Sequence, residues 1–305
     1  MLKREVIIFI GIMIFYVIFV AYSDINKFSL NLSNFNSYYI PIILVLIFGF
    51  LVIQGIRQHI LFKKISVDIS MKDNLLIFFS GLSMIATPAG SGGVIKSYFL
   101  KKKHGYAITK TFPIVFVERF HDLLAIITII VFFSLFSEIN VLSLIVAVSI
   151  LLILVFSIVR TKKFFHFMAK FLLHIPKLRK LAPRFTESYD SFYSLTSKKV
   201  TITCWAISIF AWSIQAVAIY LIFIAFGLNF DIAFTTIVTL SSVLLGTLSF
   251  LPAGVGITEF SFIGFMTDSG IELSVATSII IMVRLLGIWY ATILGFITTK
   301  YFLSR

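Results

Sequence analysis

The sequence has too few charged residues to cover a water-soluble fold. Only 13% of its 305 residues are Asp, Glu, Lys or Arg, whereas 59% are hydrophobic and the mean hydropathy is +1.06. Soluble domains carry roughly 25% charged and roughly 45–50% apolar residues. Such a composition predicts an all-α polytopic membrane protein, with residues 1–305 forming a single integral membrane domain.

Cysteine is nearly absent as well. Cys204 is the only one, which excludes a disulfide within the chain and a metal site made of cysteine thiolates. The five histidines show no metal-ligand spacing, and the sequence has no nucleotide-binding P-loop. We therefore expect no metal, no cofactor and no ATP-driven step.

The net charge of +13 lies in short basic segments between apolar runs. This arrangement favours anionic lipid headgroups at the cytoplasmic surface as partners, and it argues against nucleic acid. Lys and Arg are concentrated in 63–73, 96–110 and 160–199, while 23–39, 137–138, 227–231 and 268–274 are acidic. By the positive-inside rule we expect the basic segments and both termini to face the cytoplasm, and we expect a multi-pass protein of the plasma membrane. Six apolar runs are long enough to cross: 5–22, 40–62, 112–136, 139–159, 200–226 and 275–299.

Two further apolar stretches, 74–100 and 232–267, are interrupted near their middles. The first contains Pro88-Ala89-Gly90-Ser91-Gly92 and the second Pro252-Ala253-Gly254-Val255-Gly256. Each stretch is flanked on both sides by segments of the same charge sign. We therefore expect two re-entrant hairpins of half-helices, although the alternative is that one or both stretches simply span the membrane.

The two interruptions belong to a predicted internal repeat. Arg119 follows Pro88 by 31 residues, and Arg284 follows Pro252 by 32. The repeat regions, 63–136 and 232–299, would enter from opposite faces, as in the inverted repeats of secondary transporters. Half-helix N-termini at the breaks would present N–H groups to an anion. The candidate binding residues at the tips are Pro88, Gly90, Gly92, Pro252, Gly254 and Gly256.

Charged residues within the apolar segments complete the candidate site. Glu118, Arg119 and Asp122 lie in one predicted span, where charge is costly; the alternative is a structural ion pair near the cytoplasmic interface. Arg284 is expected either to pair with Glu259 or to contact a lipid phosphate. Lys96 either contacts an incoming headgroup or extends to the interface.

Segment 160–199 is the largest predicted cytoplasmic piece. Its apolar residues recur at helical spacing, which predicts an amphipathic helix on the membrane surface, with a partner-binding helix as the alternative. The residues on this face are Phe164, Phe167, Met168, Phe171, Leu172 and Ile175.

Four motifs together resemble the lysylphosphatidylglycerol synthase transmembrane-region family: residues 87–96, 118–122 and 252–259, followed by Arg284. The resemblance covers nearly the whole chain. The family's first motif usually has Glu where this chain has Gly93 and often has Arg where it has Lys96, whereas its second acid is present as Glu259. Larger members carry a soluble synthase domain that is missing here. The resemblance therefore implies lipid translocation without synthesis.

The leading hypothesis is a flippase-like transporter that is not an enzyme. It would move a phospholipid or polyprenyl-phosphate lipid, with the headgroup between the two Pro-Ala-Gly-x-Gly tips. One alternative is a non-transporting membrane subunit that binds lipid- or glycan-synthesis enzymes. Another is an intramembrane headgroup-modifying enzyme, for which the sequence shows no nucleophile–base pair.

Overall fold

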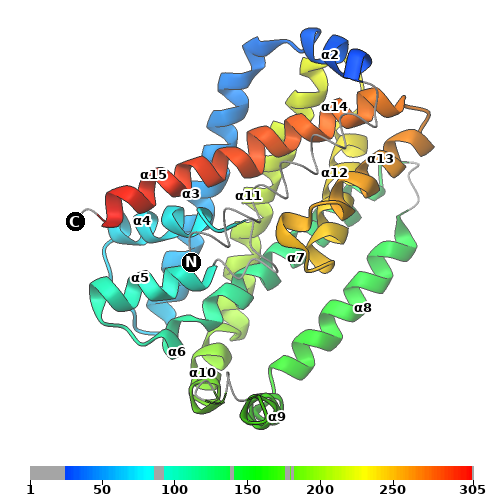
Figure 1. Cartoon of the computed structure of the whole chain (residues 1–305). Coiled ribbons are helices and arrows are strands. Elements are labelled where there is room, and N and C mark those ends of the chain that lie inside the picture. Colours follow the sequence, from blue (N-terminus) through cyan, green and yellow to red (C-terminus); the bar gives the residue numbers. More distant parts are fainter. Residues whose placement is uncertain (1–24, 86–92, 138–140, 176–178, 180–181, 304–305) are drawn as a thin grey trace.

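The protein is a polytopic helical membrane protein, seen here in a computed structural model that describes residues 25–85, 93–137, 141–175, 179 and 182–303 (Figure 1). All secondary structure in these residues is helical. Four helical segments are long and apolar enough to cross a bilayer: Ser37–Lys64, Leu142–Val159, Lys198–Ala225 and Leu273–Phe302. The predicted span at 5–22 lies outside the described residues.

The long helices agree closely with the predicted runs. They are α3 (Ile40–Lys64), α7 (Pro113–Ser134), α8 (Leu142–Val159) and α11 (Lys198–Ala225). The last span consists of α14 (Leu273–Arg284), a π-helical turn, η5 (Leu285–Trp289), and α15 (Tyr290–Leu303). The π-helical turn begins directly after Arg284, and such turns occur often at functional sites.

Both interrupted stretches are broken into shorter helices. The first comprises α4 (Met71–Leu82) and α5 (Val94–His104), and the second comprises α12 (Ile232–Leu248) and α13 (Ile257–Asp268). At about 1.5 Å per residue, α4, α5 and α13 are each too short to cross roughly 30 Å of hydrocarbon. The second break is therefore present where it was predicted. The first tip, with Pro88, Gly90 and Gly92, lies outside the described residues.

The second break is a tight turn with several left-handed residues. A short 3-10 turn, η4 (Pro252–Gly254), lies between α12 and α13. Gly254 and Gly256 have φ values of 66° and 89°, and the non-glycine residues Phe250 and Ala253 also have positive φ, at 57° and 53°. A Cβ on Gly254 would lie 2.9 Å from the Cα of Gly246 on α12. Glycine at 254 therefore permits both the backbone conformation and the close approach of the turn to α12.

The two halves of the chain interlock through equivalent contacts. The span that follows the first break, α7, packs against α12, and the span that follows the second break ends in α15, which packs against α4. The α15–α4 crossing is close, because Gly295 lies against the backbone of Leu82 and Ser83. Thr299 Oγ1 also donates to the carbonyl oxygen of Ser80 (3.2 Å). Each span thus packs on the first short helix of the other half.

Short helices lie at the two ends of the bundle. The helix α2 (Ile25–Ser33) and the short η1 (Ser37–Tyr39) precede α3, and α2 packs against α14. At the opposite end lie α6 (Ile108–Thr111), α9 (Lys162–Leu173) and α10 (Ala182–Leu195) (Figure 1). The predicted amphipathic segment therefore contains two helices, α9 and α10. Phe165 is the buried residue of α9, whereas Phe167 and Phe171 are exposed.

Candidate functional site

The second repeat region contains a buried ion pair. Glu259 lies in the first turn of α13, and Arg284 is the last residue of α14. Arg284 Nε donates to Glu259 Oε1 at 2.7 Å, and the two side chains are 7% and 0% exposed. Arg284 was expected either to pair with Glu259 or to contact a lipid phosphate, and in the structure it pairs with Glu259.

The same carboxylate caps the half-helix on which it lies. Glu259 Oε2 accepts a hydrogen bond from the backbone N–H of Gly256 at 2.7 Å. A carboxylate at this position offsets the positive end of the helix dipole. The N-terminus of α13 therefore already holds an anion of its own, which reduces its attraction for a lipid phosphate.

The first repeat region contains a buried ion pair at a corresponding place. Lys96 lies in the first turn of α5, and its Nζ is 2.6 Å from Glu118 Oε2 on α7. Lys96 also donates to Gln58 Oε1 on α3 (2.8 Å). Its side chain is only 12% exposed, so the ammonium of Lys96 is largely enclosed by these helices.

A second buried pair lies one helical turn further along α7. Asp122 Oδ1 accepts from Arg57 Nη1 (2.6 Å) and Gln54 Nε2 (2.9 Å), both on α3. Trp212 on α11 donates to the same oxygen (3.2 Å), and Arg57 also donates to Ser208. This cluster joins α3, α7 and α11 through one carboxylate.

Arg57 is the main site residue that the sequence analysis missed. It is 2% exposed and is among the largest fully buried side chains. A signal was present, because an arginine within the predicted span 40–62 is costly in a bilayer and requires a partner. Gln58, Asn74 and Ser208 were missed too, since short polar side chains in apolar helices are common and carry little signal.

Arg119 differs from the other intramembrane cations because it is half exposed. Its side chain is 47% exposed, and its nearest carboxylate contact is Asp122 Oδ2 at 3.7 Å, too long for a hydrogen bond. Phe116, one turn earlier, is 54% exposed. Phe120, the next residue, stacks on Phe156 of α8 with ring centroids 4.0 Å apart. Arg119 therefore offers a guanidinium at the outer surface of α7.

The buried clusters retain unused hydrogen-bonding groups. Among the described residues, Glu118 Oε1 and Arg284 Nη2 have no hydrogen-bond partner although both are buried. Buried polar atoms are normally paired. No group of three or more His, Cys, Asp or Glu side chains suited to a metal occurs in the described part of the chain.

The structure thus separates the predicted site residues into two groups. Lys96, Glu118, Arg119 and Asp122 lie together where α5 and α7 meet α3. Glu259 and Arg284 form the second group with the break that contains Pro252, Gly254 and Gly256. Each group has a buried ion pair of its own.

Comparisons with known proteins place these motifs in a family. The sequence matches the lysylphosphatidylglycerol synthase TM region over residues 6–295. It is 28% identical over 211 residues to the UPF0104 membrane protein MJ1078 of Methanocaldococcus jannaschii, covering 68% of this chain and 88% of that protein. A UPF0104 membrane protein of Methanothermobacter thermautotrophicus is 24% identical over 290 residues, which cover 87% of this chain and 85% of that protein. The chain therefore belongs to the lysylphosphatidylglycerol synthase transmembrane-region family.

Proposed function

We propose that this protein moves a phosphate-bearing lipid between the two leaflets of the plasma membrane, with both of its termini in the cytoplasm. The observation that carries the proposal is the cluster of charged side chains around α7 inside the apolar bundle, where the half-exposed Arg119 lies beside the ion pairs Lys96–Glu118 and Arg57–Asp122. Charge within a bilayer is costly and is typically retained for a functional path. Pairing lowers that cost without removing the charged groups from the interior.

Arg119 is the residue best placed to contact the lipid phosphate. Its guanidinium is half exposed and lies 3.7 Å from a carboxylate that three other donors already hold. A guanidinium can hold a phosphate through two parallel hydrogen bonds. From the outer surface of α7, Arg119 can meet a phosphate that arrives from the lipid phase.

The other charged residues of the first group hold the two carboxylates of α7 that lie next to Arg119. Arg57, Gln54 and Trp212 hold Asp122, whose second oxygen faces Arg119. Lys96 holds Glu118 on the same helix. In the second group, the carboxylate of Glu259 occupies the half-helix N-terminus, so we place the headgroup on the side of the first repeat region. This refines the expectation of a headgroup held equally between both tips.

A transport assay in reconstituted vesicles tests the proposal. The protein is inserted into liposomes that contain a fluorescent phospholipid, and a membrane-impermeant quencher reports the fraction of label that reaches the outer leaflet. We expect faster exchange than in protein-free vesicles, and a rate about tenfold lower for Arg119→Ala, since a charged hydrogen-bond partner is lost. Lys102→Ala, an exposed basic residue at the end of α5, is the matched control.

The outcome that would reject transport is a wild-type rate equal to that of protein-free vesicles. Mass spectrometry of lipids that copurify with the protein would then separate the alternatives. Bound lipid with unchanged headgroups would favour a non-transporting subunit of a lipid or glycan synthesis complex. Turnover of the headgroup would favour an enzyme.

A further inference from the structure

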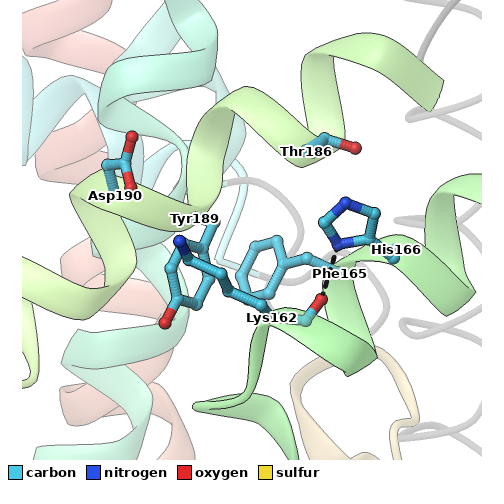
Figure 2. A pocket seen from close by; sticks show the side chains of 6 residues that line it. All are labelled: Lys162, Phe165, His166, Thr186, Tyr189 and Asp190. Carbon is cyan, nitrogen blue, oxygen red and sulfur yellow. Dashed lines mark hydrogen bonds between the residues drawn. The ribbon is translucent and has the colours of Figure 1, made fainter.

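A small pocket between α9 and α10 lies apart from the charged clusters of the bundle. It has a volume of about 180 Å³ and is lined by Lys162, Phe165, His166, Thr186, Tyr189 and Asp190 (Figure 2). Phe165 forms its floor and packs on Phe185 and Phe192 of α10, with ring centroids 5.1 and 5.7 Å apart. The pocket therefore has a firm apolar base and a polar rim.

The polar groups of the rim are available to a ligand. Within the described residues, the Lys162 ammonium, the Thr186 hydroxyl and the Asp190 carboxylate make no hydrogen bond or ion pair. The ammonium lies over the Tyr189 ring, 5.5 Å from its centroid. His166 Nδ1 lies 2.9 Å from the Lys162 carbonyl oxygen (Figure 2). Because that oxygen only accepts, Nδ1 carries the proton, and Nε2 of the neutral ring is left as an acceptor.

The pocket and the exposed phenylalanines lie on different sides of α9. Lys162 and His166 are four residues apart and share one face, whereas Phe167 and Phe171 share another. At 3.6 residues per turn the two faces are about 140° apart around the helix axis. Phe167 and Phe171 are 67% and 53% exposed. If this apolar face enters the membrane surface, as proposed for 160–199, the pocket opens toward water.

The rim combines groups that suit the two ends of a phosphorylated polyol. The ammonium can donate to phosphate oxygens, whereas the threonine hydroxyl lies on the side of His166 (Figure 2) and can bind a ligand hydroxyl. The carboxylate and the imidazole Nε2 can accept from ligand hydroxyls. Arg160, which precedes α9, adds positive potential near the rim.

We infer that the pocket between α9 and α10 binds a small phosphate ester that carries hydroxyl groups, with Lys162 on the phosphate and Asp190 on the hydroxyls. The orientation of the pocket favours a water-soluble ligand over a lipid headgroup with the same chemistry. The helix α10 packs against α6 and α7. A ligand bound between α9 and α10 would therefore stabilise the packing of these two helices on α7, which carries Arg119. The binding site itself does not depend on the proposed transport function.

Binding measurements on the full chain test this inference. The protein is placed in nanodiscs of phosphatidylcholine and titrated with glycerol phosphate by calorimetry. We expect saturable binding, no binding of glycerol, and weaker binding of inorganic phosphate. Lys162→Ala should weaken glycerol phosphate binding by about tenfold or more, through loss of a charged contact. Lys163→Ala removes an equal charge outside the pocket and should change the affinity by less than about twofold.

A second variant separates the two ends of the ligand. Asp190→Asn should weaken the binding of glycerol phosphate while leaving that of inorganic phosphate unchanged or stronger, because a negative charge is removed. Equal losses in Lys162→Ala and Lys163→Ala would overturn the inference, since they would indicate general charge attraction. It would also be overturned if glycerol phosphate failed to bind, or if binding required nanodiscs containing phosphatidylglycerol.

Discussion

Lys96 and Glu118 repeat, with the signs exchanged, the contact between Glu259 and Arg284. In each case the first turn of the short helix after the break pairs with the span that follows, at 2.6 Å in the first pair and 2.7 Å in the second. In the first pair the short helix carries the cation, and in the second it carries the anion. The two halves thus share a geometry but differ in electrostatics.

This exchange of sign makes the two breaks unequal. A carboxylate at the start of α13 satisfies the local N–H of Gly256, whereas the first turn of α5 has no acidic residue. The first turn of α13 therefore presents a carboxylate to an approaching phosphate, whereas the first turn of α5 presents the ammonium of Lys96. The difference supports a headgroup position near Arg119.

The Glu259–Arg284 pair should show strong coupling in the free energy of unfolding. Arg284→Gln leaves a buried carboxylate without its cation, and we expect a loss of about 3–5 kcal/mol. Glu259→Gln should cost a similar amount and also weaken the cap of α13. The double variant should lose much less than the sum, because neither buried charge remains. Unfolding in mixed detergent micelles measures the four proteins, and strictly additive losses would contradict a direct pair.

Gly295 should not tolerate a larger side chain. A Cβ at this position would lie 2.6 Å from the backbone carbonyl carbon of Leu82 and closer still to the Ser83 nitrogen. We expect Gly295→Ala to lower the free energy of unfolding by about 1–3 kcal/mol by forcing α15 away from α4. Gly264→Ala is the matched control, because nothing lies within 4 Å of its Cβ position. Equal stability of the two variants would argue against the close crossing.

Asp73 at the start of α4 should add a small, pH-dependent contribution to the free energy of unfolding. The hydrogen bond from Lys103 (2.6 Å) lowers the pKa of Asp73 below its ordinary value of 3.8. A carboxyl with a lowered folded-state pKa stabilises the fold above its unfolded pKa, and this stability is lost as pH falls through the folded value. Asp73→Asn should therefore cost roughly 0.2–1 kcal/mol at neutral pH.

The pH dependence gives the check on this ion pair. Near pH 3 and below, wild type and Asp73→Asn should converge in unfolding midpoint as the wild-type carboxyl takes up its proton. If the difference in unfolding midpoint between wild type and Asp73→Asn stayed constant from neutral to acid pH, the asparagine would be acting through packing and not through loss of the charge.

Much of the fold follows from local sequence signals. Pro252, Gly254 and Gly256 marked the second break because proline removes a donor and glycine permits positive φ, and both effects act locally. The ends of α3 and α11 lie within two residues of the predicted limits. At the C-terminal end of α3 and the N-terminal end of α11, a change from apolar to basic sequence marks that limit. Charge patterns of this kind need no knowledge of neighbouring helices.

The partners of the charged side chains could not be predicted in the same way. Arg57 and Asp122 are 65 residues apart, and only the packing of α3 against α7 brings them together. The helix α10 was also missed, because its apolar residues are mixed with polar ones and its buried face is defined by Phe165 on α9. Contacts between distant segments depend on tertiary packing, which sequence periodicity does not encode.

The measurement that tests the central claim most directly is phospholipid exchange in vesicles by Arg119→Ala and by the double variant Glu259→Gln/Arg284→Gln, at matched amounts of folded protein. Arg119→Ala should be slower than wild type by about tenfold, whereas the double variant should keep its rate within about twofold. If the double variant loses exchange while Arg119→Ala retains it, the phosphate does not bind at Arg119 and the site lies at the second break.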